Sequence, residues 1–365
     1  RRRNANECFG ACNKDDNPWQ LSGGDIKWYT DWLAVRGVNL FIPHAFYYSI
    51  RGKRKDERPP DVGPHSIWWA HYEAWSTYWR RLSWLTTDID LHAETAVLCR
   101  NRDLCPDTVR PLFERQIGFQ YIPESYFPAC TVEDGALWLH GHRYTAVLGD
   151  KALFPDAAHP EVSALEPDCR CDPPQPMLRC ASFNKEGRAC WLLVNEGNTP
   201  IKTRLTLPVD APLCRYDLWN GQPCACPAEH TAQGACLPLE LPARGSLLLF
   251  TCTAQETETL PLPPTYLSLP VPDFILVEED ATRAAKTYRA VLQVAAADIE
   301  AATPLLTLRG QEMAELTVNG QPAGVSFWSP HKFPLAGLLT TLTLTLTGSP
   351  ANRYGNHPVP YGLER

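Results

Sequence analysis

The apolar positions at the start of the chain follow first a helical period and then a short continuous run, in the order of a βα unit. Ile26, Tyr29 and Leu33 recur at the spacing of one helix face, which predicts an amphipathic helix. Gly37 is expected to end this helix, because glycine readily adopts the left-handed conformation found just past helix ends. Residues 38–42 are mostly apolar, and so short a run is typical of a parallel strand buried on both faces.

Two further patterns support helices in this region. Ser22-Gly-Gly-Asp25 precedes the first helix and matches a capping box, in which the hydroxyl and the carboxylate each bond a backbone N–H of the first turn. A second helix is predicted at residues 67–85, whose apolar positions form one largely aromatic stripe: Trp68, Tyr72, Trp75, Trp79 and Leu82. We expect this stripe to pack into the core and not to hold a ligand.

The period of the pattern then changes along the chain, which predicts several domains. Residues 93–155 mix helical and strand patterns and are interpreted as a small α/β subdomain. After a proline-rich linker, residues 178–255 have a period of two, which predicts a β-sandwich. Residues 272–365 are a further all-β segment, and residues 1–92 are interpreted as the C-terminal part of a (β/α)8 barrel. The predicted fold class is therefore multidomain α/β plus all-β.

Individual elements within these domains are also predicted. In the subdomain we expect strands at 94–98 and 119–122, a helix near 108–116, and a hairpin over 137–148 that turns at Gly141. In the last segment, Asn319-Gly320 predicts a hairpin turn. The alternation of threonine with leucine over 341–346 predicts a strand with one buried face.

Composition narrows the class of partner. The chain has 365 residues and a formal net charge of −7, which argues against a nucleic acid or an anionic membrane surface as partner. No apolar run is long enough to span a bilayer. Arg1-Arg2-Arg3-Asn4 is not followed by an apolar stretch, so it does not read as a secretory signal and a cytoplasmic location is expected.

The 14 cysteines are scattered along the chain and do not form the paired spacings of a zinc site. We expect free buried thiols in a reducing cytoplasm, with disulfides as the second interpretation and zinc as the third. No metal site is predicted.

Candidate catalytic and binding residues lie at two successive strand ends. One is near Glu7, and the other follows the strand predicted at 38–42. Glu7 precedes a Phe-Gly turn, and His44 follows the strand at 38–42, with Tyr47 and Tyr48 just beyond it. In a βα-barrel the carboxyl ends of the strands build the pocket. Sugar cleavage employs carboxylates, while imidazole and aromatic side chains contact sugar hydroxyls and ring faces. For each of these residues a purely structural role remains open.

Two more residues are predicted at the rim of this pocket. Trp19 and Arg51 flank it in the sequence, and Arg51 begins a charged, proline-rich loop over 51–64 that includes Asp61. This loop is either a solvated segment or a rim that binds polar substrate groups. The fingerprints of serine hydrolases, P-loop proteins, dinucleotide-binding proteins and zinc proteases do not occur in the sequence.

Several motifs together resemble a bacterial glycoside hydrolase of the family 2-like and α-L-rhamnosidase-like group. They are Glu7-Cys-Phe-Gly-Ala, Lys27-Trp-Tyr-Thr-Asp-Trp, Arg36-Gly-Val-Asn-Leu, Pro43-His-Ala-Phe-Tyr-Tyr-Ser and Glu57-Arg-Pro-Pro-Asp, followed by Leu316-Thr-Val-Asn-Gly-Gln, Trp328-Ser-Pro and Asn352-Arg-Tyr-Gly. The resemblance implies that residues 272–365 are a galactose-binding-like jelly roll. It also implies an acidic pair in the barrel, to which Glu7 belongs.

The resemblance yields a functional hypothesis and an alternative. The hypothesis is a glycosidase that cleaves O-glycosidic bonds in oligo- or polysaccharides, with the partner of Glu7 in earlier barrel strands that precede this sequence. The alternative is a non-catalytic carbohydrate-binding protein or an inactive fragment. A carbohydrate is the expected partner in each case. No cofactor is predicted; some relatives use calcium, but no ligand cluster for it is evident in this sequence.

Overall fold

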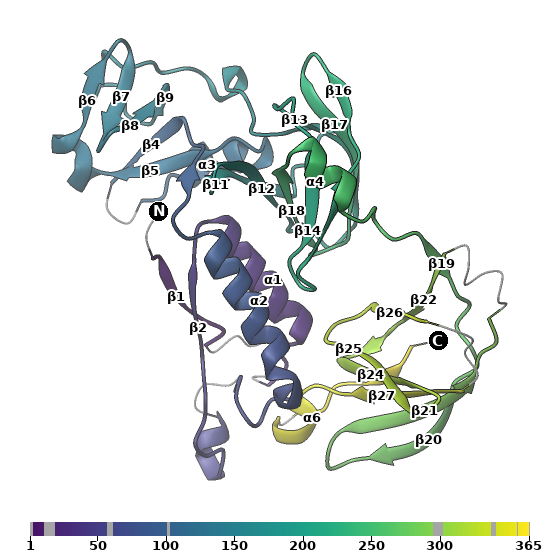
Figure 1. Ribbon diagram of the computed structural model, residues 1–365. Helices are drawn as coiled ribbons and strands as arrows, with labels where there is room; N and C mark the ends of the chain where they lie inside the picture. Colours follow the sequence, from purple (N-terminus) through teal and green to yellow (C-terminus); the bar gives the residue numbers. More distant parts are fainter. Residues whose placement is uncertain are drawn as a thin grey trace. The chain divides into compact units, whose positions relative to one another are not determined.

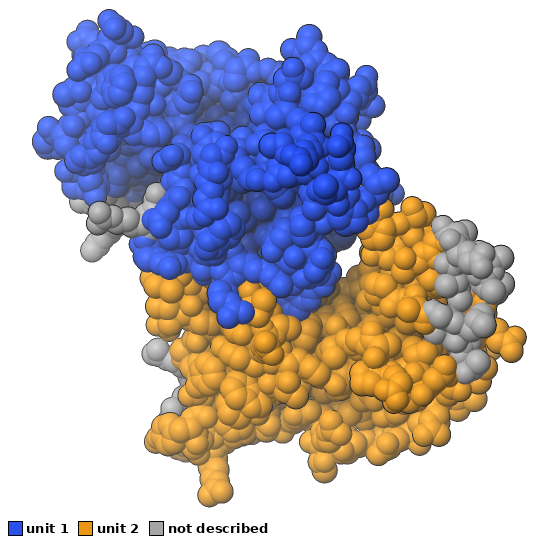
Figure 2. All heavy atoms as spheres, in the orientation of Figure 1, with its two compact units in different colours: residues 1–4, 31–39, 80–262 blue, residues 5–30, 40–79, 263–365 orange. Residues whose placement is uncertain are grey.

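The chain folds into two compact units. The computed structural model describes residues 3–10, 19–56, 61–100, 103–294, 302–336, 341–355 and 357–364. Unit 1 comprises residues 1–4, 31–39 and 80–262, and unit 2 comprises residues 5–30, 40–79 and 263–365 (Figure 2). Among the described residues, no helix is both long enough and apolar enough to cross a bilayer.

The N-terminal βα unit forms as the sequence predicts. Strand β1 (Ala5–Cys8) pairs in parallel with β2 (Leu40–Pro43), and helix α1 (Gly23–Val35) connects them (Figure 1). The capping box is confirmed: the backbone N–H of Asp25 donates to Ser22 Oγ at 3.1 Å, and the backbone N–H of Ser22 donates to Asp25 Oδ2 at 3.2 Å. Gly37 has a φ of 96°, the left-handed conformation expected just past the helix end.

The prediction that the strand at 38–42 is buried on both faces is wrong. Phe41 is buried, whereas Leu40 and Ile42 are 38% and 50% exposed. The reason is that side chains alternate between the faces of a strand, and in the described part of the chain only one face of this two-stranded sheet is covered.

The second predicted helix is confirmed, with a short 3-10 turn η2 (Trp69–His71) before α2 (Tyr72–Leu85). Its aromatic stripe is packing, as expected, because Trp75 and Leu82 are fully buried. In unit 2, Trp75 packs edge-on against Phe327, with ring centroids 5.6 Å apart. Gly23 lies next to the backbone of Phe327. A Cβ at position 23 would come within 2.3 Å of the Phe327 carbonyl oxygen, so only glycine fits there.

The α/β subdomain in unit 1 has a parallel three-stranded sheet of order β5-β4-β9. Its elements are β4 (Thr95–Cys99), α3 (Pro106–Glu114), β5 (Phe119–Pro123) and β9 (Ala146–Leu148), with a meander of β6 (Thr131–Glu133), β7 (Ala136–Leu139) and β8 (His142–Tyr144). The turn predicted at Gly141 is present, since His140 and Gly141 have φ of 49° and 81°. The second half of the predicted hairpin differs, because β9 leaves the meander and pairs in parallel with β4.

Residues 178–255 form most of two further sheets, as the period-two pattern predicts. One sheet has the order β15-β14-β18-β12-β11-β3 and consists of β15 (Gln222–Cys226), β14 (Leu213–Asp217), β18 (Ser246–Thr251), β12 (Arg188–Asn195), β11 (Leu178–Lys185) and β3 (Asp90–Leu91). The other has the order β10-β13-β17-β16 and consists of β10 (Arg170–Asp172), β13 (Ile201–Leu207), β17 (Gly234–Leu241) and β16 (Glu229–Thr231). Inward-facing leucines of both sheets share one core, which is sandwich packing.

Within the described ranges, the C-terminal β segment of unit 2 forms three sheets, and most of their strands are labelled in Figure 1. The first contains β20 (Ile275–Asp280), β21 (Ala285–Val291), β27 (Thr341–Thr347), β24 (Met313–Val318) and β25 (Gln321–Ser326); the second contains β19 (Tyr266–Ser268), β22 (Thr303–Leu308) and β26 (His331–Pro334); the third contains β23 (Gly310–Gln311) and β28 (Gly362–Leu363). The predicted alternation in β27 is confirmed, because Leu342, Leu344 and Leu346 are fully buried. The hairpin at Asn319-Gly320 joins β24 to β25.

Short helices complete the described elements: η1 (Gly52–Asp56), η3 (Glu124–Ala129), η4 (Val162–Ala164), α4 (Ala254–Thr259) and α6 (Ala351–Tyr354).

One pair of the described cysteines forms a disulfide. Cys214 and Cys252 form a disulfide with a Cα–Cα distance of 6.2 Å, so the expectation of free thiols is wrong for this pair. The reason is topological: β14 and β18 are antiparallel neighbours, which brings two cysteines 38 positions apart in the sequence into bonding distance. Apart from Cys8, the other described cysteines are free thiols, and Cys12 lies outside the described residues.

Removing this disulfide should destabilise unit 1. The double substitution Cys214→Ala/Cys252→Ala is expected to lower the free energy of unfolding by about 2–4 kcal/mol, because the unfolded chain loses a cross-linked loop. Denaturant unfolding with and without reductant measures this, and Cys190→Ala, a buried free thiol of the same sheet, is the matched control. Unfolding of the wild-type protein that is insensitive to reductant contradicts the disulfide.

His331 should make unit 2 sensitive to acid. Its ring is fully buried, Nε2 donates to the Gly310 carbonyl at 3.0 Å, and burial lowers the pKa of the imidazole to about 4. The unfolded state therefore binds a proton below pH ~6.5, and about 3 kcal/mol of stability is lost as the pH falls from there through 4. Denaturant unfolding between pH 7 and 4.5 should show a shallower pH dependence for His331→Asn than for the wild type; identical slopes contradict this account.

Candidate functional site

The parallel pairing of β1 with β2 brings Glu7 and His44 to the same end of the sheet, where both strands have their C-terminal ends. Glu7 is in register with Ile42, and the backbone N–H of His44 donates to the Cys8 carbonyl at 2.8 Å. Gly10 lies between the two side chains: a Cβ there would be 3.4 Å from His44 Cγ and 3.7 Å from Glu7 Oε1. The carboxylate and the imidazole therefore border one small space.

Glu7 lies on the uncovered face of this sheet. Cys8 on β1 and Phe41 on β2 are buried, whereas Glu7 and its paired neighbour Ile42 are exposed. Aromatic side chains pack on the face of the sheet that the helices cover, where the ring centroids of Phe9 and Trp79 are 6.1 Å apart. In a βα-barrel, helices cover the outside of the strands and the opposite face points to the interior. Glu7 thus has the orientation of an inward-facing residue.

The imidazole ring of His44 can form a further hydrogen bond through Nδ1. Its Nδ1 is buried and has no hydrogen-bond partner within the described ranges. The ring packs edge-on against Tyr47, with centroids 6.1 Å apart. Because a neutral imidazole offers one donor and one acceptor, His44 can bond a hydroxyl group that approaches beside Glu7.

The segment from His44 to Tyr48 is held by the loop that follows it. The backbone N–H of Val62 donates to the Ala45 carbonyl at 2.9 Å. A Cβ on Gly63 would lie 2.8 Å from the Phe46 ring, which itself packs edge-on against Trp69 at 5.8 Å. Close backbone approach and aromatic packing therefore fix the position of His44.

A pair formed by the buried Asp61 and the partly exposed His65 stabilises this loop and was missed by the sequence reasoning. Asp61 is 2% exposed and bonds the ring of His65 and the backbone N–H of Gly63. Asp61 is therefore an internal residue and not part of a polar rim. The available signal was the i, i+4 spacing of an acid and a histidine in a loop rich in proline. Residues 57–60 of the charged loop lie outside the described residues.

The remaining predicted site residues are spread over different environments. Trp19 is 1% exposed, donates from Nε1 to the Lys55 carbonyl at 3.0 Å, and packs against Tyr354. Its ring lies 6.4 Å from that of Tyr47, so it supports that side chain from within the core. Tyr48 is 84% exposed with the Arg54 guanidinium over its ring, and Arg51 is exposed.

The structure thus brings together Glu7, His44 and Tyr47, with Trp19 behind Tyr47. Tyr48 and Arg51, in contrast, are exposed on the surface. No group of three or more histidine, cysteine, aspartate or glutamate side chains suited to a metal ion occurs in the part of the chain that the structure describes.

Comparison with solved structures shows a fold shared with a glycoside hydrolase. A rhamnosidase from Novosphingobium sp. PP1Y matches with a TM-score of 0.67 and 13% identity, over 96% of this chain and 44% of the rhamnosidase. A β-galactosidase from Bacillus circulans sp. alkalophilus matches with a TM-score of 0.37 and 11% identity, over 63% of this chain and 52% of its own. No protein-family model matches the sequence, and neither does any curated protein.

The rhamnosidase match supports the predicted glycosidase-like, multidomain α/β plus all-β fold. At 13% identity it establishes the arrangement of the elements and not the activity. The chain spans less than half the length of the rhamnosidase.

Proposed function

We propose that this chain is part of a glycoside hydrolase that cleaves O-glycosidic bonds in oligo- or polysaccharides. The observation that carries the proposal is the position of Glu7, on the uncovered face of β1–β2 and at the same edge as His44. That face and that edge are where barrel enzymes assemble a reactive centre. The shared fold with a rhamnosidase supports the same interpretation.

In this proposal β1, α1, β2 and α2 belong to the wall of a (β/α)8 barrel, and the β segment at 272–365 is a galactose-binding-like jelly roll. Glu7 is one of the two carboxylates that glycoside hydrolysis employs. The other comes from a barrel strand different from β1 and β2. The exposed side chains of Leu40 and Ile42 then face the barrel interior.

Substrate contacts follow from the same geometry. His44 and Tyr47 contact the sugar next to the scissile bond, and Trp19 holds Tyr47 from behind. Tyr48 and Arg51, both exposed, contact the substrate from the rim. Because His44 Nδ1 has no partner within the described ranges, a sugar hydroxyl that binds there satisfies a buried polar atom.

Carbohydrate binding without cleavage is the alternative function. It is favoured by the exposure of Glu7, because a single carboxylate beside an imidazole can bind hydroxyl groups, whereas hydrolysis needs a second carboxyl group about 5–10 Å away.

Glu7→Gln distinguishes the two functions. In the hydrolase, this change is expected to lower kcat on a responsive 4-nitrophenyl glycoside by roughly 10²–10⁴-fold, because the amide neither ionises nor transfers a proton. The folded state should persist, since the side chain is exposed. A panel of such glycosides identifies the substrate, and circular dichroism checks the fold.

Glu73→Gln is the matched control, because Glu73 is an exposed acid on α2 in the same unit. Its kcat should equal that of the wild type. Normal turnover by Glu7→Gln removes Glu7 from the mechanism. A wild-type protein that carries the complete barrel and binds saccharides but cleaves none of the panel supports the binding alternative.

A further inference from the structure

A cavity of about 710 Å³ lies within unit 1, among elements that are far apart in the sequence. It is bordered by the segment that leads into β4, the linker before β10, and β11 and β12 of the six-stranded sheet. Residues near the β16–β17 turn close a further side. Its volume is within the range of small-molecule sites.

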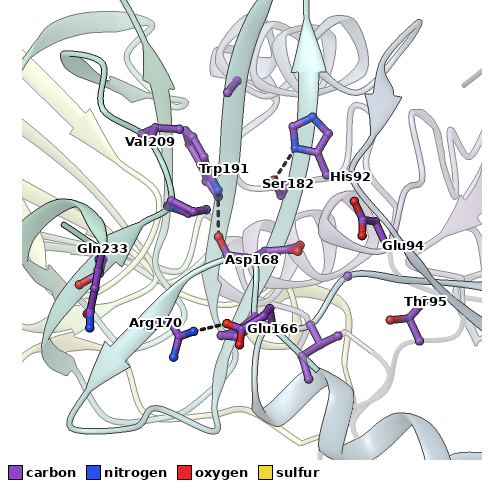
Figure 3. Close-up of a pocket in the computed structure, with 16 residues that line it drawn as sticks. His92, Glu94, Thr95, Glu166, Asp168, Arg170, Ser182, Trp191, Val209 and Gln233 are labelled. Carbon is purple, nitrogen blue, oxygen red and sulfur yellow. Dashed lines mark hydrogen bonds and ion pairs between the residues drawn. The ribbon is translucent and has the colours of Figure 1, made fainter. Parts of the chain in front are cut away.

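Asp168 is the most unusual side chain in this cavity. Its backbone is fixed, because its N–H donates to the Gln116 carbonyl at 2.8 Å and its carbonyl accepts from Trp191 Nε1 at 3.2 Å. Its Oδ2 is buried and has no hydrogen-bond partner within the described ranges. Figure 3 shows the carboxyl group directed toward the side of the cavity where His92 and Glu94 lie.

The neighbouring backbone makes room for this carboxyl group. A Cβ on Gly118 would lie 2.7 Å from Asp168 Oδ2 and 2.5 Å from the His92 carbonyl oxygen. Any residue other than glycine at position 118 would therefore displace the carboxyl group. Buried polar atoms are nearly always hydrogen-bonded in native proteins, so an unsatisfied acceptor in a cavity indicates a ligand.

The other polar groups define the chemistry of that ligand. Glu166 pairs with Arg170, and His92 Nδ1 contacts Ser182 Oγ at 3.1 Å (Figure 3). Burial raises the pKa of Asp168 to about 7; a hydrogen bond from the Gly118 backbone to the carboxyl group opposes this rise, and Glu94 adds to it slightly. A carboxyl group with a pKa of about 7 accepts a hydrogen bond from a hydroxyl group when it is ionised and donates one when it is protonated.

This inventory favours a polyhydroxylated ligand over a cation. The charge of Arg170 is balanced by its partner Glu166, and much of the remaining polar lining is neutral: Thr95, Ser182, Thr206 and Gln233. An ammonium group could pair with Glu94 and with the ionised form of Asp168, whereas a hydroxyl group can bond these carboxyl groups and the neutral groups alike. A metal ion is not favoured, because the described residues provide no group of three suitable ligands.

We propose that this cavity is a carbohydrate-binding site for a neutral mono- or disaccharide, whose hydroxyl groups bond Asp168, Glu94 and His92. This inference goes beyond the proposed hydrolase and does not depend on Glu7. Trp191 lines the cavity but is 2% exposed, so it anchors Asp168 and does not act as a stacking platform.

Isothermal titration calorimetry with the full chain tests the proposal. The probes are free neutral mono- and disaccharides (rhamnose, galactose, glucose, lactose), with spermidine and calcium chloride as cationic probes. At least one neutral saccharide is expected to bind, and Asp168→Asn and Glu94→Gln are each expected to weaken it tenfold or more. Glu94 is exposed, so its variant should fold even where Asp168→Asn does not.

Glu133→Gln is the matched control, because Glu133 is an exposed acid on β6 outside the cavity. It should bind like the wild type. Binding of only the cationic probes, binding of none at millimolar concentration, or unchanged affinity in Glu94→Gln and Asp168→Asn would each overturn the proposal. Glu7→Gln separates the two sites, since it should lower kcat and leave the affinity of the cavity unchanged.

Discussion

The parallel register of β1 and β2 is the constraint on which the functional interpretation depends. The parallel pairing of β1 with β2 places Glu7 opposite Ile42. The hydrogen bond from the backbone N–H of His44 to the Cys8 carbonyl extends this pairing to the C-terminal ends of the strands. A shift of one residue in either strand would turn its side chains to the opposite face. Glu7 would then point into the helices, and the carboxylate and imidazole would no longer share a space.

Aromatic packing keeps this register in place. The numerous tryptophans of the N-terminal region could have been sugar-stacking platforms, but Trp19 and Trp75 are buried. Through contacts with Tyr354 and Phe327, they connect the segment before α1 and helix α2 to the C-terminal β segment within unit 2. A fully buried aromatic side chain contributes several kcal/mol to stability, so these residues serve the site indirectly, by fixing the strands that carry it.

Local pattern was enough to predict most elements. The capping box at Ser22, the stop at Gly37 and the alternation in β27 each depend on interactions within a few residues. The sequence also located Glu7 and His44 at neighbouring strand ends, because a βα unit makes its strands parallel. These predictions succeeded where the cause is local or follows from chain connectivity.

Features set by distant contacts were not predictable in the same way. Leu40 and Ile42 looked like buried strand residues, since an apolar sequence does not reveal whether a face is covered. The pairing of Cys214 with Cys252 follows from sheet order. Asp168 lies in a segment with the composition of a linker, and its cavity exists only because strands from distant parts of the chain surround it.

Hydrogen–deuterium exchange of the Glu94→Gln variant, whose unit 1 cavity is expected to bind saccharides weakly, tests the central claim most directly when an oligosaccharide is bound. The account predicts slower exchange at residues 5–10 and 43–48, where β1 and β2 end beside Glu7 and His44, relative to the free protein. Unchanged exchange in both segments while the saccharide is bound would contradict the assignment of this edge as the carbohydrate-facing site.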